Sequence, residues 1–140
     1  MDPLAHHLLT EACNNAWANH RLLGACAQLS PADFDAPRSG FFASIRATLN
    51  HIVAVDAPGL LRREIRVPRA SGIHREPLQR LLAHLFQHQV HHRGQAHAML
   101  SGTPVAPPQL DEFFCVNDAP LRAADFAALG FSETAIWPAE

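Results

Sequence analysis

Three long stretches of the sequence carry apolar residues three and four positions apart, and this spacing constrains the fold more than any other feature. It is the period of one face of an α-helix. The spacing predicts helices over residues 4–29, 41–55 and 76–100, with proline, glycine or serine near their ends. A shorter helix is predicted over residues 121–129 and a last turn over residues 132–137. The chain is therefore expected to be all-α.

The stretch between the second and third predicted helices is not expected to be helical. Residues 57–75 contain two prolines and two glycines, which interrupt helices. Only turns and a short extended piece at residues 64–67 fit this composition. We therefore predict that the stretch is a connector.

Length and charge limit the classes of protein to consider. At 140 residues the chain fits one domain, residues 1–140. Its net charge of −2 and scattered arginines leave no basic surface, so no nucleic-acid partner is expected. No apolar run approaches the ~20 residues of a membrane helix, and the first residues do not read as a signal peptide. We expect a cytoplasmic protein with no membrane partner.

The cysteines and one tryptophan are expected to pack in the apolar core. Cys13, Cys26 and Cys115 are an odd number and form no CxxC pair, so neither a disulfide framework nor a thiolate zinc site is predicted. The cysteines are expected to behave as small apolar residues. Trp17 follows the helical spacing and is predicted to be core, with a pocket wall as the alternative.

Four histidines lie close together in the third predicted helix, in the segment HLFQHQVHHRGQ. His84, His88 and His92 are four residues apart and stack along one stripe, with a glutamine on the same side. Two imidazoles at positions i and i+4 can converge on one metal ion at ~2.0–2.1 Å. A third ligand must come from another element, and His51 in TLNHIVAVD is the candidate. His51, His88 and His92 are thus candidate ligands of a three-histidine site suited to Zn²⁺, Ni²⁺ or Fe²⁺.

The remaining histidines have other interpretations. Spacing leaves His91 open as a further ligand, whereas His84 is expected to form a hydrogen bond with a ligand histidine. For any single histidine, a solvent-exposed or hydrogen-bonded core role is the alternative to metal binding. Surface or capping roles are assigned to His6, His7, His20, His74 and His97.

Four segments of the chain occur in an order typical of one known family. They read NAWANHRL, SIRATLNHIVAVD, PLQRLLAHLFQHQVHHRGQAHAML and PPQLDEFF. In this order they resemble the DinB family of metal-binding four-helix proteins, a superfamily that also contains bacillithiol S-transferases and mycothiol-dependent maleylpyruvate isomerase. The resemblance implies a DinB-like bundle of the up-down type and places the metal ligands at His51, His88 and His92. It assigns the RGQ that follows to the same motif, with Gly94 allowing close helix packing.

One departure from the family pattern concerns the connector. DinB proteins usually have a whole further helix before the helix that carries HHRGQ, whereas this chain has the proline- and glycine-containing residues 57–75. The bundle is therefore expected to lack or shorten one of its four helices. A groove left open between long helices would be covered by a second copy in a two-fold homodimer. The alternative is that the connector folds over the groove and leaves a monomer.

The resemblance also implies a reaction class. A divalent metal would bind a small-molecule thiol as the thiolate and present it to an electrophile. Zn²⁺ and Ni²⁺ are the preferred metals, and Fe²⁺ and Mn²⁺ are the alternatives. No protein nucleophile is required, and no catalytic residue is assigned. The function expected is that of a metal-dependent thiol S-transferase or a related enzyme. The alternatives are a non-catalytic metal-binding protein of the stress or damage response and a purely structural bundle with core histidines.

Overall fold

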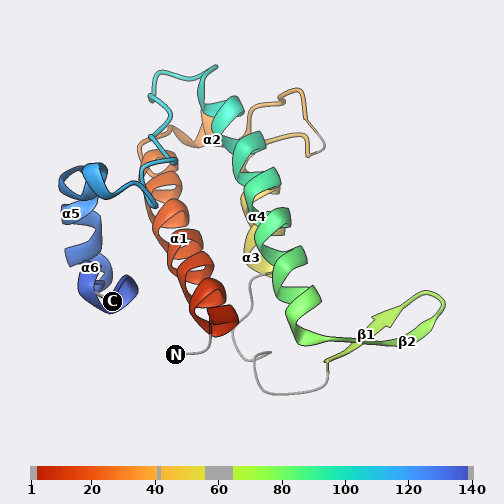
Figure 1. The fold of residues 1–140 in the computed structure, drawn as a ribbon. Coiled ribbons are helices and arrows are strands. Elements are labelled where there is room, and N and C mark those ends of the chain that lie inside the picture. Colours follow the sequence, from red (N-terminus) through yellow and green to blue (C-terminus); the bar gives the residue numbers. More distant parts are fainter. Residues whose placement is uncertain (1–2, 41, 56–64, 139–140) are drawn as a thin grey trace.

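The computed structural model describes residues 3–40, 42–55 and 65–138. Its long helices are α1 (Pro3–Cys26), α3 (Ile45–Val55) and α4 (Leu78–Leu100). In Figure 1, α1 and α4 lie side by side and run in the same direction, and α3 packs against α4 in the opposite direction. The predicted all-α bundle is confirmed. The shorter elements are α2 (Pro31–Asp35), the 3-10 turn η2 (Val116–Asp118), α5 (Ala119–Leu129) and α6 (Glu133–Ile136).

The helix ends differ from the predicted ends by a few residues, for local reasons. The first helix stops at Cys26 and not at residue 29, and α2 follows because the Ser30 hydroxyl accepts a hydrogen bond from the Asp33 amide. This cap, with a proline after Ser30, was a sequence signal for α2 that the prediction missed. The second helix begins at Ile45 and not at residue 41. The Ser44 hydroxyl precedes its first residue and accepts a hydrogen bond from the Ala47 amide.

The described part of the connector is a β-hairpin that extends away from the bundle (Figure 1). Strands β1 (Ile65–Arg69) and β2 (Gly72–Glu76) pair antiparallel, and Gly72 adopts a φ of 124° that favours glycine. Because β2 extends to Glu76, α4 begins at Leu78 and not at residue 76. The non-helical connector is confirmed for these residues, although the sequence predicted only a short extended piece. Residues 56–64 lie outside the described part.

The homodimer and the single domain remain predictions. The groove expected beside the second helix depends on the side chains of residues 51–55. The structure describes the helical backbone of these residues but not their side chains. Among the described residues, no helix is long and apolar enough to cross a lipid bilayer.

The core of the bundle lies where α1, α3 and α4 meet. Apolar side chains from all three helices are buried there, so the stripes predicted from spacing face one another. Cys26 is among them, as predicted, and burial raises the pKa of its thiol to about 11. The prediction is wrong for Cys115, which is exposed. The buried members are Leu22, Ala25, Cys26, Ile45, Leu49, Ala96, Met99 and Leu100.

A second apolar cluster attaches the C-terminal tail to α1. Trp17 is fully buried, as predicted, and its ring centroid lies 5.6 Å from that of Phe113. The Trp17 indole N–H donates to the Asp125 carboxylate at 3.2 Å. The other buried members are Ala18, Phe126 and Ile136. The tail therefore packs on α1 through a core of its own.

Within the tail, Arg122 is almost completely buried and binds several segments at once. Its guanidinium donates to both carboxylate oxygens of Glu133 at 2.7 and 2.9 Å. It also donates to the backbone carbonyl oxygens of Glu112 at 2.6 Å and Cys115 at 2.8 Å. One side chain thus joins α5, α6 and the segment that precedes η2.

We expect Arg122→Met to lower the free energy of unfolding by about 2–3 kcal/mol, because it leaves a carboxylate and two carbonyl groups without their donor. Urea denaturation measures this change. The matched control is Arg46→Met, since Arg46 forms an exposed ion pair with Asp35 and should leave the midpoint unchanged. Equal midpoints for the two variants would contradict the role given to Arg122.

A second prediction concerns alkaline pH. The chain has no lysine and no tyrosine, so its three thiols are the main groups that titrate between pH 9 and 11. The pKa of Cys26 is about 11 in the folded protein against an ordinary value of 9.0. The folded state therefore holds this proton more tightly than the unfolded state does. The contribution of the raised Cys26 pKa to the free energy of unfolding is complete below pH 9 and is lost as the pH rises to 11.

Urea midpoints measured between pH 9 and pH 11 should therefore fall more steeply for the wild type than for Cys26→Ala. The control Cys115→Ala removes an exposed thiol and should keep the wild-type slope. If Cys26→Ala shows the wild-type slope as well, another group causes the alkaline loss.

Candidate functional site

The histidines of α4 differ strongly in exposure, and this difference selects two of them. His92 is only 5% exposed and His88 is half-buried, whereas His84 and His91 are exposed. The His92 ring lies beside Phe42, from the segment before α3, with ring centroids 5.4 Å apart. The stripe predicted from helical spacing therefore turns toward the α3 side of the bundle.

His88 and His92 direct the same ring atom toward a common point. Their Nε2 atoms are 3.1 Å apart, and the rings meet edge to face at 4.3 Å. Two nitrogen ligands each ~2.0–2.1 Å from a tetrahedral ion lie about 3.3 Å from one another. The observed separation is therefore close to the one that a shared metal ion requires.

Gln95 fixes the orientation of the His92 ring. Its Oε1 lies 2.7 Å from His92 Nδ1, and its Nε2 lies 3.3 Å from His91 Nε2. Because an amide oxygen only accepts, the network places the His92 proton on Nδ1 and leaves the Nε2 lone pair directed at His88. A hydrogen bond of this kind on the far nitrogen is typical of metal-binding histidines.

Among the described residues, His84 has no hydrogen bond to a ligand histidine. Its ring lies against that of His88 with centroids 5.7 Å apart, and Gln95 accepts the hydrogen bond that orients His92. The sequence placed Gln95 on the correct side of the helix but did not assign it this role. The signal was available in the i, i+3 spacing from His92.

The third candidate ligand is only partly placed. His51 belongs to α3, which packs against α4, but its side chain lies outside the described residues. Among the residues that the structure describes, no group of three histidine, cysteine or carboxylate side chains is arranged to hold a metal ion. The described part of the site is therefore the pair His88–His92, and His51 remains a prediction.

The two residues after His92 act differently from one another. Arg93 is 5% exposed, and its Nη1 donates to the amide oxygens of Asn15 and Asn19 on α1, the second at 3.3 Å. The expectation that Gly94 allows close helix packing is wrong, because a Cβ added there would meet nothing within 4 Å. The asparagine pair, one helical turn apart, was a sequence signal for the Arg93 contact that the analysis did not use.

The five histidines assigned to surface or capping roles are found in such places, and His7 is exposed on α1. His6 Nε2 lies 2.7 Å from the backbone oxygen of Ile136, at the end of α6. His97 Nε2 lies 2.9 Å from the backbone oxygen of Pro108. His74 is exposed beside Ser71, and His20 lies near Asp125 at the surface. None of these five belongs to the pair on α4.

A comparison of the sequence with models of protein families gives the same family as the motifs of the sequence. A model of the DinB family matches residues 5–58 and 58–119. The chain belongs to the DinB family. No curated protein and no solved structure matches it. The matched part of this DinB protein includes α1, α3, α4 and all three candidate ligands, whereas nearly all of the tail from Ala119 onward lies beyond it.

The hydrogen bond that His92 donates to Gln95 predicts the proton position on His92 in the metal-free protein. Long-range ¹H–¹⁵N correlation spectra should show Nδ1 protonated in the wild type and a mixture of tautomers in Gln95→Ala, which lacks the acceptor. The control Gln87→Ala changes an exposed glutamine on the same helix and should leave the tautomer unchanged. An unaltered spectrum for Gln95→Ala would contradict the orienting role.

Proposed function

We propose that this DinB protein binds one divalent transition metal through His51, His88 and His92 and acts as a metal-dependent transferase on a small-molecule thiol. The observation that supports the metal site is the 3.1 Å separation of the His88 and His92 Nε2 atoms. Family membership supports it further, because DinB proteins are generally metal-binding.

The donor set determines which metals fit. Three neutral imidazoles suit borderline ions, so Zn²⁺ and Ni²⁺ are favoured over Fe²⁺ and Mn²⁺. Three protein ligands also leave a coordination position open, as catalytic sites require. His91 lies close to His92, with ring centroids 4.9 Å apart, and is the alternative if His51 does not ligate.

The residues around the pair would contribute orientation and shielding. When bound, the metal would lower the pKa of an incoming thiol and favour the thiolate, which is the reactive form. Gln95 keeps the His92 proton on Nδ1, away from the ligand side of the ring. Phe42 covers one side of the same ring and restricts water there. In the transfer itself the thiol proton would pass to solvent, the sulfur would form a bond to the electrophilic carbon, and the leaving group would depart with the electron pair of the bond that breaks.

A second candidate function is metal binding without catalysis, as in a stress- or damage-response protein. The β-hairpin favours it, because the described connector supplies two strands where DinB proteins usually place a helix. Activity against a panel of small thiols with an electrophilic acceptor separates the two functions. Transfer that depends on added metal supports the transferase, and metal binding without transfer supports the alternative.

The metal site itself is tested by elemental analysis of protein purified without chelators. We expect about one divalent metal per chain, and His88→Ala and His51→Ala should both lose it because two imidazoles bind far more weakly than three. The control is His74→Ala, an exposed histidine on the hairpin, which should retain the metal. Wild-type protein with less than a tenth of an equivalent and no uptake on titration would exclude the site.

A further inference from the structure

One face of α1 is exposed along most of the helix and is mainly apolar. Leu9, Ala12, Ala16, His20 and Leu23 are all exposed, Leu9 by 38% and Leu23 by 46%. At about 100° per residue, these five residues lie within about 40° of one line along the helix. Surface helices usually direct charged residues to solvent, and none of the five carries a formal charge at pH 7. We refer to these five residues as the α1 stripe.

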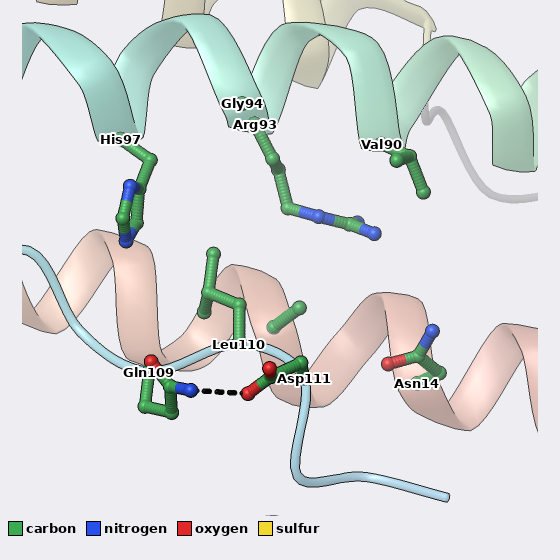
Figure 2. A pocket seen from close by; sticks show the side chains of 9 residues that line it. Asn14, Val90, Arg93, Gly94, His97, Gln109, Leu110 and Asp111 are labelled. Carbon is green, nitrogen blue, oxygen red and sulfur yellow. Dashed lines mark hydrogen bonds between the residues drawn. The ribbon is translucent and has the colours of Figure 1, made fainter.

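The other sides of α1 are covered by the rest of the chain. Trp17 packs in the cluster that holds the tail, and Asn15 accepts a hydrogen bond from Arg93 of α4. On the side roughly opposite the α1 stripe, Asn14 lines a cavity between α1, α4 and residues 109–111 (Figure 2). The described elements therefore cover these sides of α1 and leave the α1 stripe exposed.

The α1 stripe has the same spacing when it is read from either end. Ala16 lies at its centre, with Ala12 and His20 four residues away and Leu9 and Leu23 seven residues away. If two copies of α1 lie antiparallel with their Ala16 residues in contact, Leu9 of each copy meets Leu23 of the other. The small Ala12 likewise meets the larger His20. The α1 stripe is thus complementary to itself, as a two-fold interface requires.

The electrostatics of α1 favour an antiparallel partner over a parallel one. A helix carries a partial positive charge at its N-terminus and a partial negative charge at its C-terminus. The first turn of α1 (Pro3–Cys26) contains no acidic side chain and its last turn contains no basic one, so the helix does not balance these partial charges itself. An antiparallel copy places the opposite partial charge beside each end, whereas a parallel copy would place like charges together.

We propose that the α1 stripe is the interface of a two-fold homodimer in which the two α1 helices pack antiparallel around Ala16. The small side chain at the centre allows the helix axes to approach to about 8 Å, the short end of the usual range. The two helices then overlap over about 30 Å. This interface uses none of the side chains of residues 51–55, on which the groove beside the second helix depends.

The size of the contact sets the expected strength of the dimer. Standard interfaces bury about 800 Å² on each partner through roughly 20–30 residues, and the α1 stripe with its neighbours supplies about ten. We therefore expect roughly 600–700 Å² of buried surface in total, which is typical of weak and reversible association. The dimer should form at high micromolar protein concentration and dissociate on dilution.

Sedimentation velocity of the full chain between about 10 µM and about 1 mM measures this association. The mass should rise from 15.3 kDa toward twice that value. Leu9→Glu should weaken association at least about tenfold, because it places a carboxylate against an apolar side chain. The matched control is Leu121→Glu, since Leu121 is 59% exposed on α5 and should leave the association unchanged.

Charge rescue separates a lost interface from a misfolded variant. Leu23→Lys should also fail to associate with itself. A mixture of Leu9→Glu and Leu23→Lys should associate again, because the antiparallel pairing brings the two introduced charges together and leaves the other Leu9–Leu23 contact intact. A misfolded variant would not regain association on mixing.

Disulfide formation tests the direction of the pairing in a Cys115→Ser background, which removes the exposed thiol. Ala16→Cys should form a disulfide-linked dimer, because the two residues face each other at the two-fold axis. Leu9→Cys should link to Leu23→Cys in a mixture but not to itself. The control Ala128→Cys places a thiol at an exposed position of α5 and should not link.

Three results would overturn the α1 interface. The first is a mass that stays near 15.3 kDa at the highest concentration. The second is a dimer that survives Leu9→Glu, which would place the contact on another face. The third is Leu9→Cys that links to itself and not to Leu23→Cys, which would make the helices parallel.

Discussion

The hydrogen bonds from Arg93 to Asn15 and Asn19 set the rotation of α4 against α1, and the histidine pair and the contact of α4 with the tail both depend on that rotation. A turn of α4 by one residue would move every side chain about 100° around the helix axis. His92 would leave the side of Phe42, and His97 would leave the tail segment that it contacts. A buried polar contact of this kind specifies one arrangement where apolar packing alone would tolerate several.

The geometry of the two faces of α4 has different origins. On the side of the histidine pair, local contacts within one helix determine most of the geometry, because His88, His92 and Gln95 are all within two turns. On the opposite face, a cavity of about 360 Å³ between α1, α4 and residues 109–111 exists because the tail crosses from α4 back to α1. The first face depends on secondary structure, and the second depends on the tertiary fold.

This difference explains what the sequence could predict. The pairing of His88 with His92 follows from helical spacing, and so does the burial of Trp17. The expectation of close packing at Gly94 failed because helical spacing does not tell which positions another element covers, and a Cβ added at Gly94 would meet nothing within 4 Å. The β-hairpin was missed because the prolines and glycines of residues 57–75 indicate only that a helix stops. His51 shows the limit on the site, since spacing within one helix cannot place a ligand from another.

The two apolar cores share α1 but are made from adjacent stretches of it. Trp17 and Ala18 belong to the tail cluster, whereas Leu22 and Cys26 belong to the bundle. The tail could therefore detach as a unit while the bundle stays folded, in the manner of a local unfolding equilibrium. Because the segment at residues 109–111 forms one wall of the cavity, such detachment would abolish the cavity. Any molecule that bound in the cavity would therefore also stabilise the docking of the tail on α1 and α4.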